Sequence, residues 1–184
     1  MNCYVLTGGR STRMGQSKAA LFLDRVVEQA GAVFDRVIAV ERHGAQPLAI
    51  DTIFEDWHGD EAPAFGLARA LADGPGPSFV LAVDLPLIRK DVLSFLRSRF
   101  EASNASMLVP VWDGAPQVLC AGYRTCIAPM LAERIAAGKY DLRGLLKEAD
   151  VEMIEEAALR ARFAGEPLMN VNTPAEREEA ERMR

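Results

Sequence analysis

Short apolar runs alternate with amphipathic segments along the whole chain. The runs predict buried strands at Cys3–Thr7, Arg36–Val40, Pro47–Phe54, Ser78–Val83, Met107–Val111 and Val118–Tyr123, with a short edge strand at Val151–Ile154. Apolar residues at helical spacing predict helices around Ala64–Leu71, Asp91–Phe100, Ile127–Ala137 and Leu142–Glu148, and a charged terminal helix that ends near Met183. Because strands alternate with helices, the expected fold class is α/β: a three-layer α/β/α sandwich around a Rossmann-like, mostly parallel sheet.

Composition narrows the class of protein. The chain has 184 residues, of which 49% are hydrophobic and 26% charged, and this predicts one globular domain over residues 1–184. A net charge of -5 argues against a general nucleic-acid binder. We expect no membrane partner, because no long apolar span is present. Three cysteines without a close pair predict neither a disulfide framework nor structural zinc, and favour a cytoplasmic protein.

The first predicted strand runs directly into a glycine-rich, cationic loop. Gly8 and Gly9 allow backbone N–H groups to approach an anion closely, and consecutive amides can form a nest around a phosphate. Arg10, Arg13 and Lys18 add positive charge along the same loop. The spacing fits neither a Walker loop nor the dinucleotide fingerprint. The loop therefore predicts a polyphosphate site of another kind; a surface turn with solvated cations is the simpler alternative.

The same stretch resembles the nucleotidyltransferase signature Leu-x-Gly-Gly-x-Ser-x-Arg-Met-Gly-x-x-Lys. The chain is most similar to the molybdenum cofactor guanylyltransferases and their cytidylyl relatives. The resemblance implies GTP as donor, molybdopterin as acceptor, and catalytic roles for Arg13 and Lys18. The matching residues are Leu6, Gly8, Gly9, Ser11, Arg13, Met14, Gly15 and Lys18. The residues that the resemblance assigns to nucleotide binding are Leu6, Thr7, Gly8, Gly9, Lys18, Asp56 and Asp84.

Asp84 is the candidate metal ligand. It follows the predicted strand Ser78–Val83, where a carboxylate at the end of a parallel strand can hold Mg²⁺ together with phosphate oxygens. A turn aspartate before Pro86 is the structural alternative. The Asp-x-Pro sequence also resembles the metal-binding aspartate of the same family, so Mg²⁺ is the expected cofactor.

Three further polar residues are candidates on weaker grounds. Asn170 and Asn172 could contact the metal, the acceptor or a phosphate, and the resemblance places similar asparagines there. The segment they occupy also reads as a helix start, with Thr173 as cap and Pro174 in the first turn. Asp56 matches a family aspartate near the nucleotide, but it lies in an acidic run that is commonly solvated.

The chain departs from the family pattern after Lys18 and around the base site. Apolar spacing alone predicts one long helix over Ser17–Phe34, whereas the family has an extended piece and a turn; we expect Asp24 to cap a shortened helix. Ala39 is expected to replace an asparagine that follows the second strand. The family loop Gly-Pro-Leu-x-Gly is reduced here to its proline and last glycine, in Ala62-Pro63-Ala64-Phe65-Gly66.

The predicted reaction is attack of an acceptor phosphate on the α-phosphorus of a nucleoside triphosphate. Such an acceptor is already anionic, so alignment and charge neutralisation suffice without a general base. A cytidylyl or sugar-nucleotide transferase, or a nucleotide-binding relative without catalysis, remains an alternative. His43 and His58 are expected to be surface or loop residues rather than catalysts. The cations Arg124, Arg143 and Lys147 could meet an anionic acceptor, but solvated side chains are the simpler interpretation. We expect a monomer or weak homo-oligomer that contacts cofactor-biosynthesis or delivery proteins.

Overall fold

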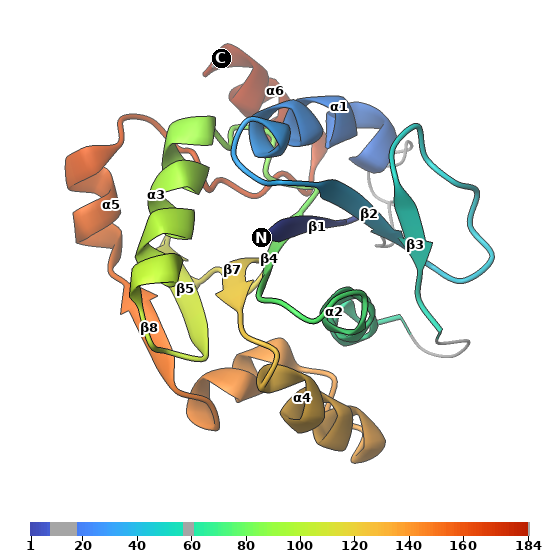
Figure 1. Ribbon diagram of the computed structural model, residues 1–184. Helices are drawn as coiled ribbons and strands as arrows, with labels where there is room; N and C mark the ends of the chain where they lie inside the picture. Colours follow the sequence, from blue (N-terminus) through green and yellow to red (C-terminus); the bar gives the residue numbers. More distant parts are fainter. Residues whose placement is uncertain (8–17, 57–60, 184) are drawn as a thin grey trace.

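A computed structural model describes residues 1–7, 18–56 and 61–183 of the chain (Figure 1). Its strands are β1 (Asn2–Leu6), β2 (Val37–Glu41), β3 (Thr52–Phe54), β4 (Ser78–Ala82), β5 (Met107–Trp112), β6 (Ala115–Pro116), β7 (Cys120–Tyr123) and β8 (Val151–Ile154). Its helices are α1 (Lys18–Gly31), α2 (Pro63–Ala72), α3 (Lys90–Ala102), α4 (Ile127–Ala136), the 3-10 helix η2 (Leu142–Lys147), α5 (Glu156–Arg162) and α6 (Pro174–Arg182). None of these helices is long and apolar enough to cross a bilayer.

The strands form one sheet in the order β3-β2-β1-β4-β7-β5-β6, with β8 beside β5. Strands β1 to β4 are mutually parallel where they pair, and β8 runs parallel to β5. Strand β7 is antiparallel to both β4 and β5. The expected Rossmann-like, mostly parallel sheet is therefore confirmed.

Apolar side chains cover both faces of this sheet. Along β1, Cys3 and Val5 belong to one hydrophobic cluster, with residues of α1, α3, α5 and α6, whereas Tyr4 and Leu6 belong to a second cluster with α2, α4 and η2. This alternation follows from strand geometry, in which successive side chains point to opposite faces. Figure 1 shows α2 and α4 below the sheet and α1 and α3 on its other side, which confirms the three-layer sandwich.

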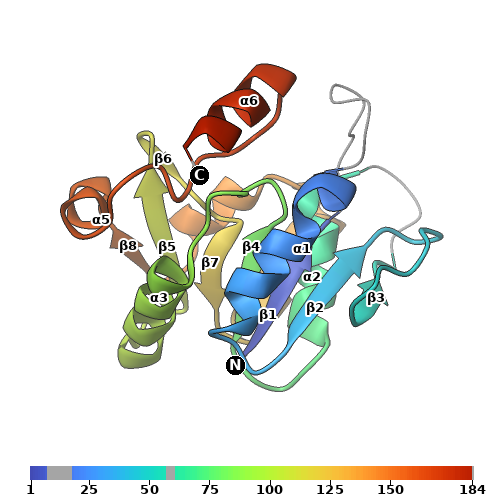
Figure 2. The ribbon, with the colours of Figure 1, turned by 90° about the horizontal axis from the view of Figure 1, so that it is seen from above.

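The order of the strands reverses between β1 and β4. From β1 the chain passes through α1 to β2 on one side, whereas β4 pairs with β1 on the other side. In open α/β sheets, ligands bind beyond the carboxyl ends of the strands at such a reversal of strand order. Figure 2 shows the sheet from above, with the segment that precedes α6 returning toward β4 and β6.

Two local expectations are wrong. Helix α1 runs without a break from Lys18 to Gly31, so Asp24 is an exposed residue inside it and caps nothing. The helix is continuous because Phe22, Val26 and Ala30 bury one face against the sheet. Ala39 is a fully buried residue in the middle of β2, and the end of that strand is Glu41. Ala39 therefore does not follow the second strand, where the resemblance expects the family asparagine.

Of the last two helices, the sequence predicted α6 but not α5. Helix α5 was not expected, because its seven residues bury a single leucine, Leu159. Helix α6 begins as the sequence predicts. The Thr173 side chain accepts a hydrogen bond from the Glu176 backbone N–H, and Pro174 occupies the first turn.

Candidate active site

Asp84 stands just beyond the carboxyl end of β4, at the reversal of strand order. The Val83 backbone N–H donates to the Leu6 carbonyl at 3.1 Å, which continues the β1–β4 pairing up to Asp84. The Asp84 carbonyl accepts a hydrogen bond from the Val171 N–H at 2.9 Å, and Oδ1 of its carboxylate is buried. The backbone on both sides of Asp84 is therefore fixed to β1 and to the C-terminal segment.

A cavity of about 210 Å³ opens beside Asp84. Asn170, Gln117 and Arg143 contribute its other polar walls, although they come from three distant parts of the chain. The apolar and small residues that complete the lining are Ala82, Leu85, Pro116, Val118 and Leu119. Asp84 and Asn170, both candidate site residues, thus line the same cavity.

Arg143 reaches this cavity from the first turn of η2. The Asp141 side chain accepts hydrogen bonds from the backbone N–H groups of Arg143 and Gly144, at 3.1 and 2.8 Å, and thereby caps the turn. Beneath it lies the nearly buried Arg134, whose Nη2 donates to the Asp141 carbonyl at 2.7 Å and whose Nη1 binds Glu148. Among the described residues, the Arg143 guanidinium makes no hydrogen bond or ion pair, so its charge is available to an anion.

The donor set around the cavity suits a hard divalent cation. Asp84 supplies a carboxylate, and Asn170 supplies an amide oxygen. Within residues 1–7, 18–56 and 61–183, no three His, Cys, Asp or Glu side chains gather as a metal cage. Mg²⁺ is commonly held by one or two carboxylates and the substrate's phosphates rather than by such a cage, and the residues present fit that arrangement.

Most of the glycine loop lies outside the described residues. Gly8, Gly9, Arg10 and Arg13 belong to that part, and only the backbone of Lys18 is described, as the first residue of α1. The first turn of α1 contains no acidic residue, so no carboxylate there opposes an anion at the positive end of the helix.

Leu6 and Thr7 carry the chain from β1 toward this loop. Leu6 is buried, and the Thr7 hydroxyl donates to the Val40 carbonyl at 2.8 Å. Gly66 of α2 packs so closely on Leu6 that a Cβ there would lie 2.8 Å from the leucine side chain and 3.0 Å from Glu55 Oε1. Close packing therefore explains why the last glycine of the family loop is retained.

Asp56 and Asn172 are not among the residues that line the Asp84 cavity. Asp56 is exposed just past β3. Its neighbour Glu55 is half-buried, and this burial raises the pKa of Glu55 to about 7; Arg42 opposes the rise, whereas Glu41 and Glu61 add to it. Asn172 is exposed, and its backbone N–H donates to Glu176 at 2.6 Å, as part of the α6 start.

His43 and Arg124, which were expected to be exposed to solvent, differ in their surroundings. His43 is exposed, as expected, whereas His58 lies outside the described residues. Arg124 is not a solvated cation: it is half-buried, donates to the Ala105 and Ser103 carbonyls, and packs over the Phe100 ring. All three cysteines are free thiols.

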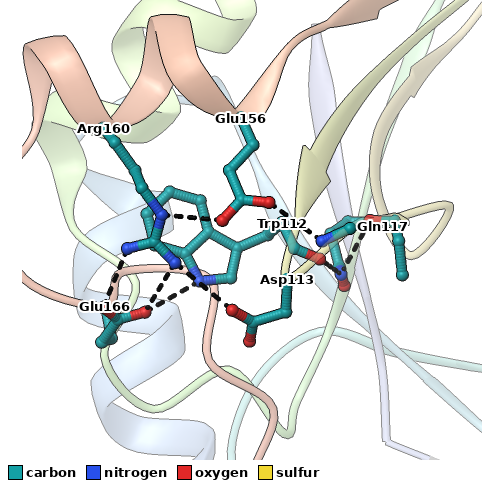
Figure 3. A network of polar contacts seen from close by, with 8 residues as sticks. Trp112, Asp113, Gln117, Glu156, Arg160 and Glu166 are labelled. Carbon is teal, nitrogen blue, oxygen red and sulfur yellow. Dashed lines mark hydrogen bonds and ion pairs between the residues drawn. The ribbon is translucent and has the colours of Figure 1, made fainter.

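Gln117 is the site residue that the sequence did not indicate. It follows β6, and its side chain bonds Asn170 across more than fifty positions of the chain. No local pattern marks such a contact, because it depends on how the β5–β6 hairpin and the C-terminal segment meet. Its proximity to Trp112 and the surrounding ion pairs is visible in Figure 3.

Comparisons with known proteins agree with the fold and identify the family. The family model of the MobA-like NTP transferase domain matches residues 3–156. A probable molybdenum cofactor guanylyltransferase of Mycobacterium marinum is 34% identical, over 94% of this chain and 89% of its own length. The crystal structure of molybdopterin-guanine dinucleotide biosynthesis protein A from Archaeoglobus fulgidus superposes with a TM-score of 0.86 at 25% identity, covering 99% of this chain and 97% of that one. A Thermus thermophilus 2-C-methyl-D-erythritol 4-phosphate cytidylyltransferase shares the fold at 15% identity, with a TM-score of 0.69 and coverage of 97% and 96%.

Proposed function

The chain belongs to the family of MobA-like NTP transferase domains, and on that premise we propose that it transfers GMP from GTP to the phosphate of molybdenum-molybdopterin. The products are the guanine dinucleotide cofactor and pyrophosphate. The proposal is supported by relatives named as probable molybdenum cofactor guanylyltransferases, which align with this chain over most of their length. The geometry adds one observation: Asp84 and Asn170, 86 positions apart in sequence, line one cavity at the carboxyl ends of the parallel strands.

In this reaction an oxygen of the acceptor phosphate attacks the α-phosphorus of GTP. A new P–O bond forms, the bond between the α-phosphorus and the bridging oxygen breaks, and pyrophosphate leaves with the electron pair. The acceptor oxygen is already anionic, so no side chain has to remove a proton. The protein therefore works by holding two anions in line and by balancing their charge.

The glycine loop and Asp84 divide the binding of GTP between them. We propose that Gly8, Gly9 and the neighbouring amides hold the triphosphate, and that Arg13 and Lys18 balance its charge. Asp84, with the amide oxygen of Asn170, would hold the magnesium ion. When bound, Mg²⁺ draws charge from the phosphate oxygens and stabilises the departing pyrophosphate.

The acceptor would lie on the Arg143 side of the cavity. The Arg143 guanidinium can form two parallel hydrogen bonds to a phosphate, which would orient the attacking oxygen. Asn172 stays a proposed contact of the acceptor from the edge of the segment, outside the cavity lining. Asp56 stays a proposed nucleotide contact beyond β3. We propose that this chemistry takes place in the cytoplasm and needs no oligomer beyond a weak one.

The test is a triphosphate panel followed by a transfer assay. Binding of GTP, CTP, ATP and UTP is measured by calorimetry with and without Mg²⁺, and pyrophosphate release is then followed with molybdenum-molybdopterin. We expect tight, Mg²⁺-dependent binding of GTP and acceptor-dependent release of pyrophosphate. A preference for CTP would assign the chain to the cytidylyl branch, and binding without pyrophosphate release would leave a nucleotide-binding relative without catalysis.

A further inference from the structure

The β5–β6 hairpin fixes the orientation of the side-chain amide of Gln117. Its Nε2 donates to the carbonyls of Trp112 and Ala115, at 3.1 and 3.2 Å. Carbonyl oxygens only accept hydrogen bonds, so the nitrogen must face them and both of its hydrogens are used. The backbone of Gln117 is fixed as well, because its N–H donates to Pro110 at 2.8 Å and its carbonyl accepts from Cys120 at 2.9 Å.

This orientation passes on to Asn170. With Nε2 engaged, Oε1 of Gln117 faces away from the hairpin, and it accepts a hydrogen bond from Nδ2 of Asn170 at 3.1 Å. The bond turns Nδ2 of Asn170 toward Gln117 and uses one of its two hydrogens. The oxygen, Oδ1, lies on the other branch of the amide, and the described part of the chain provides no hydrogen bond for it, so it is available to a ligand in the shared cavity.

The rest of the segment around Asn170 is clamped to the same hairpin. Glu166 accepts hydrogen bonds from Trp112 Nε1 at 3.1 Å and from Arg160 at 2.9 Å, while the Arg160 guanidinium lies 4.1 Å from the Trp112 ring centre. Figure 3 shows these contacts, together with the ion pairs of Arg160 to Glu156 and Asp113. On the other side of Asn170, the Val171 N–H is bonded to the Asp84 carbonyl. The backbone is thus held on both sides of Asn170. The rotation of the Asn170 side-chain amide is what remains free, and the bond to Gln117 fixes it.

We propose that Gln117 is a positioning residue that turns the oxygen of Asn170 toward the metal-bound nucleotide. This inference rests on the proposed function, since it concerns the same Asp84 cavity. An Asn170 oxygen held in this orientation favours a divalent cation over a ligand that only accepts hydrogen bonds, such as a bare phosphate oxygen. Groups that orient a metal's ligands typically change metal affinity by about 10- to 100-fold when removed.

The experiment measures how much a divalent cation strengthens GTP binding. Calorimetry gives the affinity for GTP with and without Mn²⁺ for the wild type, Gln117→Met, Asn170→Ala and the double variant. We expect Gln117→Met to reduce the Mn²⁺-dependent gain by about 10-fold or more, with the metal-free affinity unchanged. The double variant should lose no more than Asn170→Ala alone, because Gln117 acts through Asn170.

Two further variants separate positioning from mere stability. Gln29→Met removes another half-buried glutamine, whose oxygen accepts the Lys90 N–H and which does not line the cavity, and it should leave the gain unchanged. Gln117→Glu keeps an oxygen for Nδ2 of Asn170 but cannot donate to the hairpin carbonyls. It should lower the melting temperature and retain the Mn²⁺-dependent gain.

The outcomes separate the two proposals. Wild-type protein that binds no GTP would overturn the proposed function. A wild type with a clear Mn²⁺-dependent gain that Gln117→Met retains would overturn the positioning role alone. So would a double variant that loses more than Asn170→Ala, or a Gln117→Glu variant that loses as much as Gln117→Met, since either would mean that Gln117 acts through the hairpin.

Discussion

Gly144→Ala offers a quantitative test of the packing around Arg134, the buried arginine beneath Arg143. A Cβ on Gly144 would lie 1.9 Å from Nη2 and 2.4 Å from Cζ of Arg134. Ordinary contact begins near 3.4 Å, so the guanidinium would have to move by about 1.5 Å. Arg134 is nearly buried, and the move would break its 2.7 Å bond to the Asp141 carbonyl. Overpacking costs about 1–3 kcal/mol and a charged hydrogen bond a further 1.5–3 kcal/mol, so we expect about 3 kcal/mol of lost stability.

The measurement is denaturant unfolding, with thermal melting as a second probe. A loss of about 3 kcal/mol corresponds to a fall of roughly 6–12 °C in melting temperature for a chain of this size. Gly31→Ala is the matched control, because no atom lies within 4 Å of its added Cβ, and it should change stability little. In an Arg134→Ala background, Gly144→Ala should cost less than about 1 kcal/mol. Equal costs of Gly144→Ala in both backgrounds would refute the proposed clash with Arg134.

The remaining predictions concern charge, chemistry and the hairpin clamp. The pKa of Glu55 is raised to about 7 in the folded protein from 4.5, so its contribution to stability is full below pH 4.5 and is lost as pH rises toward 7. The difference in unfolding free energy between the wild type and Glu55→Gln should therefore fall over that pH range. A difference that does not change with pH would contradict the raised pKa. Lys18→Ala and Asp84→Ala should each lower turnover by roughly 10²–10³-fold with an unchanged melting curve, and unchanged turnover would remove that residue from the site. Trp112→Phe loses the 3.1 Å bond to Glu166 and keeps the ring under Arg160, so it should cost about 1 kcal/mol in urea unfolding; no loss would show that this bond contributes nothing.

Much of the fold follows from hydrophobic patterning, because buried parallel strands such as Ser78–Ala82 are continuous apolar runs. The same logic predicted Asp84, since a carboxylate directly after a central strand has to lie at the ligand-binding edge. Helix α1 continues past Asp24 as its apolar spacing alone predicts, and the shortened helix was expected only from the family resemblance. What could not be predicted depends on tertiary contacts, because the two-residue strand β6 is defined only by its pairing with the end of β5.

The residues of the site differ in the same way. Asn170 was predicted from a short motif, whereas Gln117 is important only because the hairpin and the C-terminal segment meet. The buried Arg134 under η2 shows the same limit, since nothing near it in sequence announces that Gly144 has to leave room for its guanidinium. Local patterns identified the groups with chemistry, and they did not identify the groups that hold them in place.

The return of the C-terminal segment to Asp84 has a consequence for how the protein is made. The glycine loop and Asp84 leave the ribosome well before Asn170, because chains are synthesised from the N-terminus. A nascent or truncated chain that ends before Glu166 would contain the glycine loop. It would lack the Glu166 contact to Trp112 and the Asn170 amide that lines the cavity. Under the proposed function, the ability to bind a metal-loaded nucleotide would therefore arise late in synthesis, and a prematurely ended chain would be inactive.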